Sequence, residues 1–215
     1  MLSLEVLLVV IPIVLFSLSV HEYSHGLAAL LLGDSTAQRL GRLTLNPLKH
    51  LDLWGTIAIL LIGIGWAKPV PVMVENLEKG RKSLYIVALA GPVSNFIIAL
   101  FFALLFHLFN LSNDYDTFMG AMNLSKFFVI MVFLNVALGI FNLLPLPPLD
   151  GGNIIYSLLP DKLADSYSRY SGRLVIVSIV LIFVLAKSFP SIIIAPVISI
   201  MDMLIPNGIS FLIGG

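Results

Sequence analysis

The sequence predicts an α-helical polytopic membrane protein with about four to six transmembrane segments and a small membrane-associated β or re-entrant element. Of the 215 residues, 59% are apolar and only 11% are charged, whereas soluble domains carry about 25% charged residues. The mean hydropathy is +1.03. The apolar residues gather in runs, several of which reach the roughly 20 residues that a membrane-spanning helix needs.

The first apolar run covers residues 2–32. Ser17 and Ser19 imitate the small residues of a secretory cleavage site. A signal peptide also has a basic region before its apolar core, but Glu5 is the only charged residue before His21, and the run continues to Leu32. We therefore expect one uncleaved membrane helix.

Two later runs, residues 84–109 and 127–146, are long enough to span a membrane as helices. The segment 54–72, WGTIAILLIGIGWAKPVPV, has a shorter apolar part, three glycines, and prolines at positions 69 and 71. This composition predicts a re-entrant or β-like segment, which membranes tolerate only where protein shields the backbone.

The last apolar stretch, residues 174–205, is interrupted by Lys187, Pro190 and Pro196. Proline removes a helical hydrogen bond and clashes with the preceding turn. One kinked helix and two short elements both fit this pattern.

The charged residues of the connecting loops predict an orientation. Residues 33–83 hold seven Lys and Arg residues and residues 147–173 hold three, whereas residues 110–126 hold Asp114, Asp116 and only Lys126. Basic loops stay in the cytoplasm. We expect both basic loops there and the N-terminus outside.

The composition also excludes some classes of function. Lys plus Arg and Asp plus Glu each total 12, and no clustered basic face suggests nucleic-acid binding. The chain has no cysteine, which excludes disulfides and Cys-ligated metals.

The strongest chemical signal is the pentapeptide HEYSH at residues 21–25. Residues four apart share one face of a helix, so His21 and His25 can bind one metal ion with Glu22 beside them. This is the spacing of zinc hydrolases, in which the Glu takes a proton from water. The alternative is a pair of histidines that hydrogen-bond neighbouring helices, with Glu22 protonated or paired with a Lys. We assign no chemistry to His50, expected to be solvated, or to His107, expected at the membrane interface.

A zinc site of this kind needs a third protein ligand. Asp150 is the candidate, because it follows an apolar segment that returns to the side where the first helix ends. It lies in NLLPLPPLDGG, residues 142–152. The prolines prevent a regular helix, and Gly151 and Gly152 are expected to loosen the backbone so that Asp150 reaches the metal. The alternative is an ordinary helix-end or turn Asp that precedes a glycine.

Five segments together resemble the site-2 protease family of intramembrane zinc metalloproteases, in its short prokaryotic form. They are HEYSHGLAALLLGD, GRLTLNPLKHLDLWGT, GWAKPVPV, LAGPVSN and NLLPLPPLDGG, in that order within residues 15–155. The resemblance implies one zinc ion per chain, bound by His21, His25 and Asp150, with Glu22 as catalytic base. It further implies an endopeptidase that hydrolyses peptide bonds in or near transmembrane segments of its substrates.

Two asparagines are candidate substrate-binding residues. Asn142 and Asn95 lie near or within apolar stretches, and an amide can donate to an oxyanion or to substrate backbone. Hydrogen bonding between helices is the alternative for both. Gly91 and Pro92 are expected to allow close packing rather than to act directly.

We expect residues 1–215 to form a single membrane-embedded domain, with a catalytic core at about 1–155 and C-terminal membrane segments at about 173–206. The expected partners are the lipid bilayer of the cell membrane and transmembrane protein or peptide substrates. A metal-binding transporter and a proteolytically inactive scaffold remain the alternatives. The sequence does not predict the oligomeric state.

Overall fold

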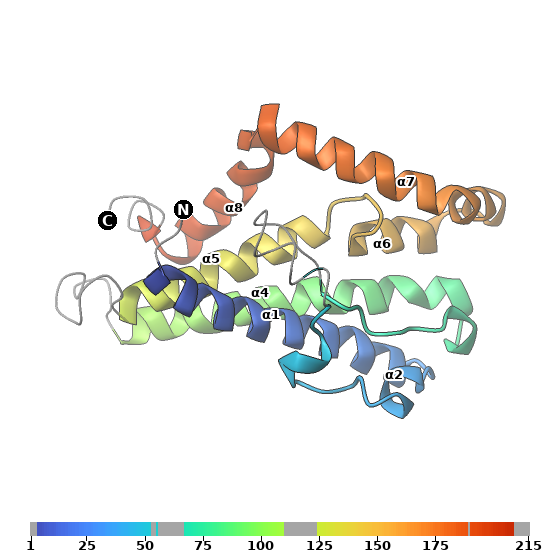
Figure 1. The fold of residues 1–215 in the computed structure, drawn as a ribbon, viewed down its shortest axis with the longest axis horizontal. Coiled ribbons are helices and arrows are strands. Elements are labelled where there is room, and N and C mark those ends of the chain that lie inside the picture. The colour runs from blue at the N-terminus through green and yellow to red at the C-terminus, as the bar shows by residue number, and fades with distance from the viewer. Residues whose placement is uncertain (1–3, 53–54, 56–66, 110–123, 189, 209–215) are drawn as a thin grey trace.

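The computed structural model describes residues 4–52, 55, 67–109, 124–188 and 190–208, which form helices joined by loops (Figure 1). The elements, in chain order, are α1 (Leu4–Leu31), α2 (Thr36–Arg39), the short 3₁₀ helices η1 (Pro47–Lys49), η2 (Val74–Asn76) and η3 (Gly80–Ser83), then α4 (Leu84–Leu108), α5 (Leu124–Asn142), α6 (Asp150–Leu158), α7 (Asp161–Ser188) and α8 (Pro190–Leu204).

The predicted helical membrane architecture is confirmed. Among the described residues, three helices are long and apolar enough to cross a membrane: Leu8–Leu31, Gly80–Leu108 and Leu124–Asn142. Ile194–Leu204 forms a shorter apolar helix. The two central runs of the sequence thus became α4 and α5, as their lengths predicted.

The C-terminal apolar stretch forms two elements rather than one kinked helix. Helix α7 ends at Ser188 and α8 begins at Pro190, a residue whose fixed backbone angle suits the first turn of a helix. Helix α8 turns back from α7 toward α5 in Figure 1, and α5 and α8 are in contact. Helix α7 begins at Asp161, well before the apolar part of its sequence.

Most of the predicted re-entrant or β segment lies outside the described residues, which omit 53–54 and 56–66. Its two flanks are described and lie side by side. Leu51 and Ala67 form an isolated antiparallel bridge, and the Lys68 N–H donates to the His50 carbonyl over 2.8 Å. The chain therefore returns at Ala67 to the place that it left at Leu51.

Helix α4 is the central element of the fold, because it packs against α1, α5 and α6. Helix α1 contributes a buried stripe in which every member is four residues from the next. The stripe consists of Ile13, Ser17, His21, His25 and Ala29. Its polar members lie among helices, where their groups need partners inside the protein.

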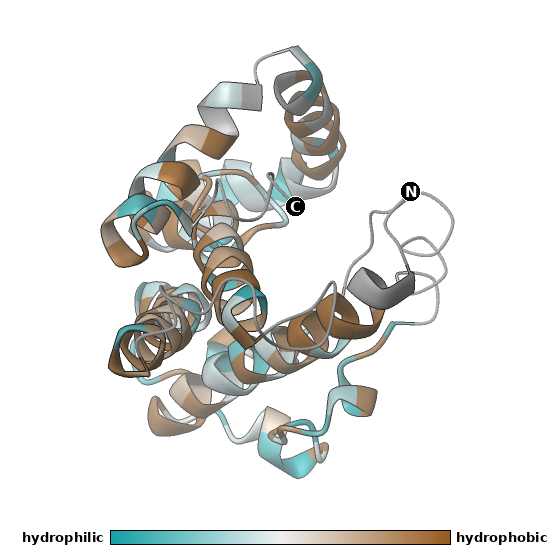
Figure 2. Ribbon diagram, turned by 90° about the vertical axis from the view of Figure 1, so that its left-hand side faces the viewer, coloured by the Kyte–Doolittle hydropathy of each residue, from teal (hydrophilic) through white to brown (hydrophobic). Residues whose placement is uncertain are grey.

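The largest apolar core lies between α4, α5 and α8. Its fully buried members include Ala99 of α4, Val132 and Val136 of α5, and Met201 of α8. Figure 2 shows that hydrophobic residues dominate the long helices and that hydrophilic residues concentrate at the loops and helix ends. In a membrane, the apolar outer faces of these helices contact lipid rather than water.

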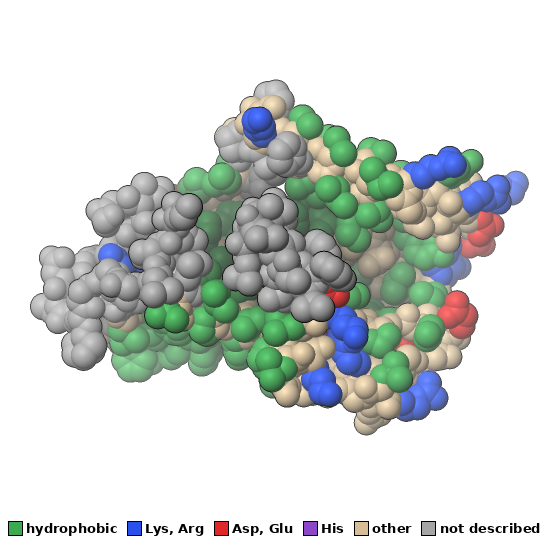
Figure 3. Space-filling view, viewed as in Figure 1, with side chains coloured by type: hydrophobic (Ala, Val, Ile, Leu, Met, Phe, Trp, Pro, Cys, Tyr) green, Lys and Arg blue, Asp and Glu red, His purple; other side chains and the backbone are tan. Residues whose placement is uncertain are grey.

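Charged side chains gather at one end of the molecule. In the space-filling view, most visible Lys, Arg, Asp and Glu side chains lie at the end that carries α2 and the beginning of α7 (Figure 3). One cross-link at this end joins Arg81 of η3 to Asp161 of α7 over 2.7 Å. Arg81 also donates to the Tyr156 carbonyl over 2.6 Å. These contacts tie α6 and α7 to the start of α4.

Candidate metal centre

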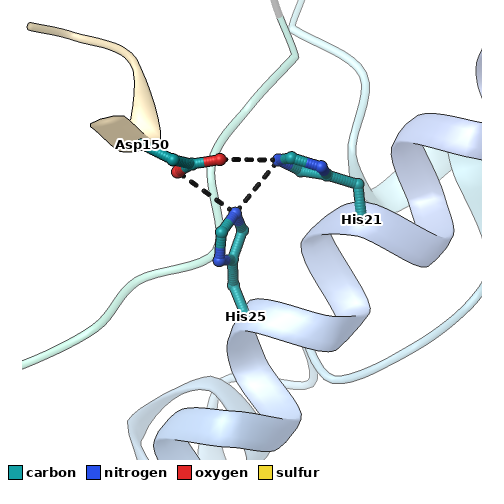
Figure 4. A group of neighbouring side chains, drawn as sticks. All are labelled: His21, His25 and Asp150. Atoms are coloured by element: carbon teal, nitrogen blue, oxygen red, sulfur yellow. Dashed lines mark hydrogen bonds and ion pairs between the residues drawn. The ribbon is translucent and has the colours of Figure 1, made fainter. Parts of the chain in front are cut away.

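Three residues that are far apart in the sequence meet in one cluster. His21 and His25 project from the same face of α1 toward Asp150, the first residue of α6 (Figure 4). The two Nε2 atoms are 3.0 Å apart. Asp150 Oδ2 lies 3.2 Å from His21 Nε2, and Asp150 Oδ1 lies 3.3 Å from His25 Nε2. The three side chains predicted as ligands therefore converge.

Helix α4 fits closely against this cluster at Gly91. A Cβ atom built on Gly91 would lie 2.4 Å from His25 Nε2 and 2.6 Å from His21 Cε1, and such distances are not tolerated. With any larger residue, the imidazoles or α4 would have to shift, so glycine lets α4 pack beside both rings as observed. The prediction that Gly91 serves close packing is confirmed.

A sharp turn brings Asp150 to the histidines. Helix α5 ends at Asn142, and the chain is non-helical until α6 begins at Asp150. Gly151 and Gly152 do not loosen this backbone, contrary to expectation, because both lie buried in the first turn of α6. A Cβ on Gly151 would lie 2.2 Å from the Leu144 carbonyl oxygen. Their small size lets α6 begin against the turn that precedes it.

Hydrogen bonds on the far side of each imidazole fix its tautomer. His25 Nδ1 lies 2.7 Å from the Val87 carbonyl oxygen, which can only accept, so Nδ1 carries the hydrogen. His21 Nδ1 lies 2.7 Å from Asn95 Oδ1. Asn95 uses its Nδ2 to donate to Asn135 Oδ1 over 3.0 Å. With Nδ1 protonated in both neutral rings, each Nε2 presents a lone pair to the cluster.

Asn135 completes this buried chain of hydrogen bonds. Its Nδ2 donates to the Met131 carbonyl and to Ser17 Oγ, each over 2.9 Å. Because the Met131 carbonyl can only accept, the orientation of the Asn135 amide is determined, and with it that of Asn95. The chain links α5, α4 and α1, and it ends on a residue predicted to bind the metal.

The donor set fits a zinc ion. Two imidazole lone pairs and a carboxylate point at one another, and Asp150 Oδ2 is buried without a hydrogen-bond partner. Three converging acceptors repel unless a cation lies among them. Four ligands at zinc's usual 2.0–2.1 Å in a tetrahedron would be about 3.3 Å apart, which matches the observed 3.0 to 3.3 Å separations.

Glu22 lies beside the cluster rather than in it. Its Oε2 accepts a hydrogen bond of 2.7 Å from the Val70 backbone N–H. The carboxylate is half-buried, and within the described residues it forms no hydrogen bond or ion pair with the two histidines or Asp150. This is the position expected of a base that must stay free to take a proton.

The two predicted substrate-binding asparagines have partners within the protein. Both amide atoms of Asn95 are used, one on His21 and one on Asn135, which favours the alternative of interhelical bonding for this residue. Asn142 Nδ2 donates to the Leu138 carbonyl of its own helix over 3.0 Å. The prediction that Asn142 contacts substrate stays a prediction.

Several residues that support the site were not predicted from the sequence. Val87 and Val70 act through backbone atoms, which no side-chain pattern reveals. Asn135 was identifiable only as a polar residue inside an apolar helix. His50 was expected to be solvated, and this was wrong, because it is 3% exposed and its Nε2 lies 2.7 Å from the Thr44 carbonyl.

Comparison with known proteins matches the chain to one family. The sequence profile described as Peptidase family M50 matches residues 9–119 and 111–186. The chain is 47% identical over 162 residues to "Putative zinc metalloprotease YwhC" of Bacillus subtilis, covering 74% of this chain and 72% of that protein. It is 33% identical over 142 residues to "Putative zinc metalloprotease Rip2" of Mycolicibacterium smegmatis, covering 64% of this chain and 52% of that protein. No solved structure matches significantly.

Proposed function

Because the chain belongs to peptidase family M50, the site-2 protease family, we propose that His21, His25 and Asp150 hold its zinc ion and that Glu22 is its general base. The family consists of intramembrane zinc metalloproteases, so the chain is a zinc metalloendopeptidase that acts on membrane-embedded proteins. The observation that carries the residue assignment is the convergence of two imidazole Nε2 atoms and the Asp150 carboxylate at 3.0 to 3.3 Å.

The chain's own residues supply binding, orientation and proton transfer. When bound, zinc acts as a Lewis acid that polarises the scissile carbonyl and activates water. Asn95 and the Val87 carbonyl keep the imidazoles of His21 and His25 in the tautomer that binds through Nε2. The Glu22 carboxylate accepts the proton of the attacking water and returns it to the leaving amine nitrogen.

The proposed substrate is a peptide bond in or near a transmembrane segment. Such a segment hydrogen-bonds its own backbone, so it must unwind locally before it can be cleaved, and the freed groups need new partners. Asn142, which lies eight residues before Asp150 and is half-buried, is our candidate for contact with this unwound backbone.

We further propose that the protein lies in the cell membrane with its N-terminus outside and its metal centre toward the cytoplasm. The gathering of charged side chains at the end with α2 and the start of α7 supports this orientation (Figure 3). We propose one membrane-embedded domain for residues 1–215, with a catalytic core at about 1–155, since His21, His25, Asp150 and the hydrogen-bond partners of the two imidazoles all lie within this range.

The test is to measure bound zinc and cleavage of a reporter transmembrane peptide in detergent for the native chain, Glu22→Gln and Asp150→Ala. We expect about one zinc per chain and cleavage for the native protein. Glu22→Gln should keep zinc and lose cleavage, because an amide cannot accept the proton. Asp150→Ala should lose zinc.

Asp165→Ala is the matched control, because Asp165 is an exposed carboxylate of α7. It should keep both zinc and cleavage. Zinc that remains bound after Asp150→Ala would exclude Asp150 as a ligand. A Glu22→Gln variant that cleaves normally would exclude Glu22 as the base.

A further inference from the structure

The peptide group between Pro69 and Val70 lies between two charged side chains. Its N–H donates to Glu22 Oε2 over 2.7 Å. Its carbonyl oxygen accepts from Arg42 Nη2 over 3.2 Å. In a trans peptide, N–H and C=O point in opposite directions, and the only cis bond among the described residues is Pro147–Pro148. Arg42 and Glu22 therefore bind opposite ends of one peptide dipole.

The local sequence leaves one amide for this contact. Pro69 and Pro71 have no N–H, and the Lys68 N–H already donates to the His50 carbonyl. Within residues 68–71, Val70 thus supplies the only N–H that can reach Glu22. The prolines on both sides also restrict the backbone, so the direction of this N–H is largely preset.

Packing holds Val70 against α1 close to the base. Val70 is 7% exposed. A Cβ built on Gly26, one turn beyond Glu22, would lie 3.1 Å from Val70 Cγ1 and 3.1 Å from Leu43 Cδ1. The glycine thus allows both side chains to approach the helix, and the Val70 backbone reaches Glu22 as a result.

Arg42 holds two successive carbonyl groups of this segment. Its Nη2 donates to the Lys68 oxygen over 2.9 Å as well as to the Pro69 oxygen. Its own backbone N–H donates to the carbonyl of buried Ala37 over 2.8 Å. Beyond Val70, the Met73 N–H donates to Asp34 Oδ2 over 2.7 Å. The segment is therefore anchored on both sides of Val70.

We propose that Arg42 is a positioning residue for peptide hydrolysis, and that it acts through the Pro69–Val70 peptide group to hold the Glu22 carboxylate in one orientation. A cation on the carbonyl oxygen polarises the peptide and strengthens its N–H as a donor. Arg42 thereby fixes the base without touching the reacting atoms. This inference rests on the proposed role of Glu22.

The first test compares kcat, KM and bound zinc for Arg42→Ala, Arg42→Lys and the native chain, with a fluorogenic transmembrane peptide that the native chain cleaves. Arg42→Ala should lower kcat about tenfold or more, since misplacing a reacting group by about 1 Å can cost 100-fold, and should leave KM and zinc content nearly unchanged. Arg42→Lys keeps the charge but not the planar fork and should restore part of kcat.

The control for these variants is Arg39→Ala. Arg39 is exposed and lies three residues away, and among the described residues its guanidinium donates only to Thr36 Oγ1, over 3.4 Å. It should behave as the native chain. An Arg42→Ala variant with native kcat, or one whose loss follows loss of zinc or a rise in KM alone, would overturn the proposal.

The second test does not depend on activity. Hydrogen exchange of the Val70 amide in zinc-loaded, ¹⁵N-valine-labelled protein, with Val70→Ile to assign the signal, reports the Glu22 contact directly. Exchange should be about tenfold faster in Arg42→Ala and in Glu22→Ala, but native in Arg39→Ala. Unchanged exchange in Arg42→Ala would refute the proposal that Arg42 acts on Glu22 through the Pro69–Val70 peptide group.

The two tests also separate this inference from the proposed function. If Glu22→Gln cleaves the peptide normally but Arg42→Ala accelerates Val70 exchange, the coupling of Arg42 to Glu22 through the Pro69–Val70 peptide group stands and the assignment of Glu22 as base fails. If Arg42→Ala does not fold, Arg42→Gln replaces it in both measurements, because glutamine keeps one N–H donor without the charge.

Discussion

The hydrogen on each imidazole decides what His21 and His25 can bind. Val87 can only accept at its carbonyl, and the orientation of Asn95 follows from Asn135 and Met131. In each neutral ring, Nδ1 therefore carries the hydrogen and Nε2, the atom that faces Asp150, is left to bind a metal. Such supporting partners typically contribute 10- to 100-fold to metal affinity.

Replacing Asn95 by Leu should weaken zinc binding about tenfold or more. The variant removes the acceptor of the His21 Nδ1 hydrogen and leaves the Asn135 amide without one partner. Chelator competition measures the affinity. Ser94→Ala is the control, because among the described residues the Ser94 hydroxyl donates only to the Gly91 carbonyl of its own helix. Native affinity in Asn95→Leu would show that the His21 tautomer does not need this contact.

Asp34 is the buried carboxylate that anchors the end of α1. Burial alone would raise its pKa, but hydrogen bonds from Thr36, Met73 and Asn76 outweigh burial and lower the pKa below its ordinary 3.8. A lowered folded-state pKa means that the ionised group stabilises the fold above about pH 4. This contribution to stability is lost as the pH falls through the lowered pKa that Asp34 has in the folded state.

The change Asp34→Asn should therefore lower stability by about 2 kcal/mol at pH 7, because hydrogen bonds to a charged acceptor are replaced by weaker ones. Thermal unfolding in detergent from pH 7 to pH 3 measures the effect. The difference between the native chain and the variant should shrink below about pH 4. A difference in stability that stays constant down to pH 3 would show that the ionised Asp34 carboxylate does not provide this stabilisation.

Glycine allows close packing at two places in the site. Gly91 of α4 lies against both imidazoles, and Gly151 of α6 lies against the carbonyls of Leu143 and Leu144. A Cβ atom at Gly91 would meet the two imidazoles and one at Gly151 would meet backbone atoms, so in both cases a packed neighbour would have to shift. The metal cluster thus depends on how closely α4 and α6 approach α1.

The change Gly91→Ala should abolish zinc binding, or reduce it at least about 100-fold, because the new methyl group would occupy space beside His25 Nε2. Zinc content after dialysis measures this loss, and circular dichroism confirms that the helices persist. Gly172→Ala in α7 is the matched control, since a Cβ there meets nothing within 4 Å. Native zinc content in Gly91→Ala would contradict the observed packing.

The elements and the ligands were predictable from sequence to different degrees. Apolar run lengths predicted α1, α4 and α5, and the HEYSH spacing with the later Asp150 predicted the three side chains that converge. The extent of α7 was not predictable, because its first half is polar and has no membrane signal. Val87 and Val70 contribute their own backbone groups. Arg42 binds backbone carbonyls of a distant segment through its side chain. Only tertiary structure reveals such contacts.

At the scale of the whole molecule, the charge distribution predicts which end faces the cytoplasm. Residues 49 and 162 lie in the two basic connections, and residue 113 lies in the acidic one. Helix α4 separates residue 49 from residue 113, and α5 separates residue 113 from residue 162. If both helices span the membrane, residues 49 and 162 lie on one side and residue 113 lies on the other.

The absence of cysteine makes this prediction testable with single thiols. Lys49→Cys and Lys162→Cys should react with a membrane-impermeant maleimide only from the cytoplasmic side of vesicles, and Asn113→Cys only from the outside. The reverse pattern would invert the orientation, and labelling of all three from one side would refute spanning by α4 and α5.

His25 lies six residues before the end of α1, about 9 Å along the helix. In the predicted orientation, an impermeant chelator should therefore inhibit inside-out vesicles and spare right-side-out ones.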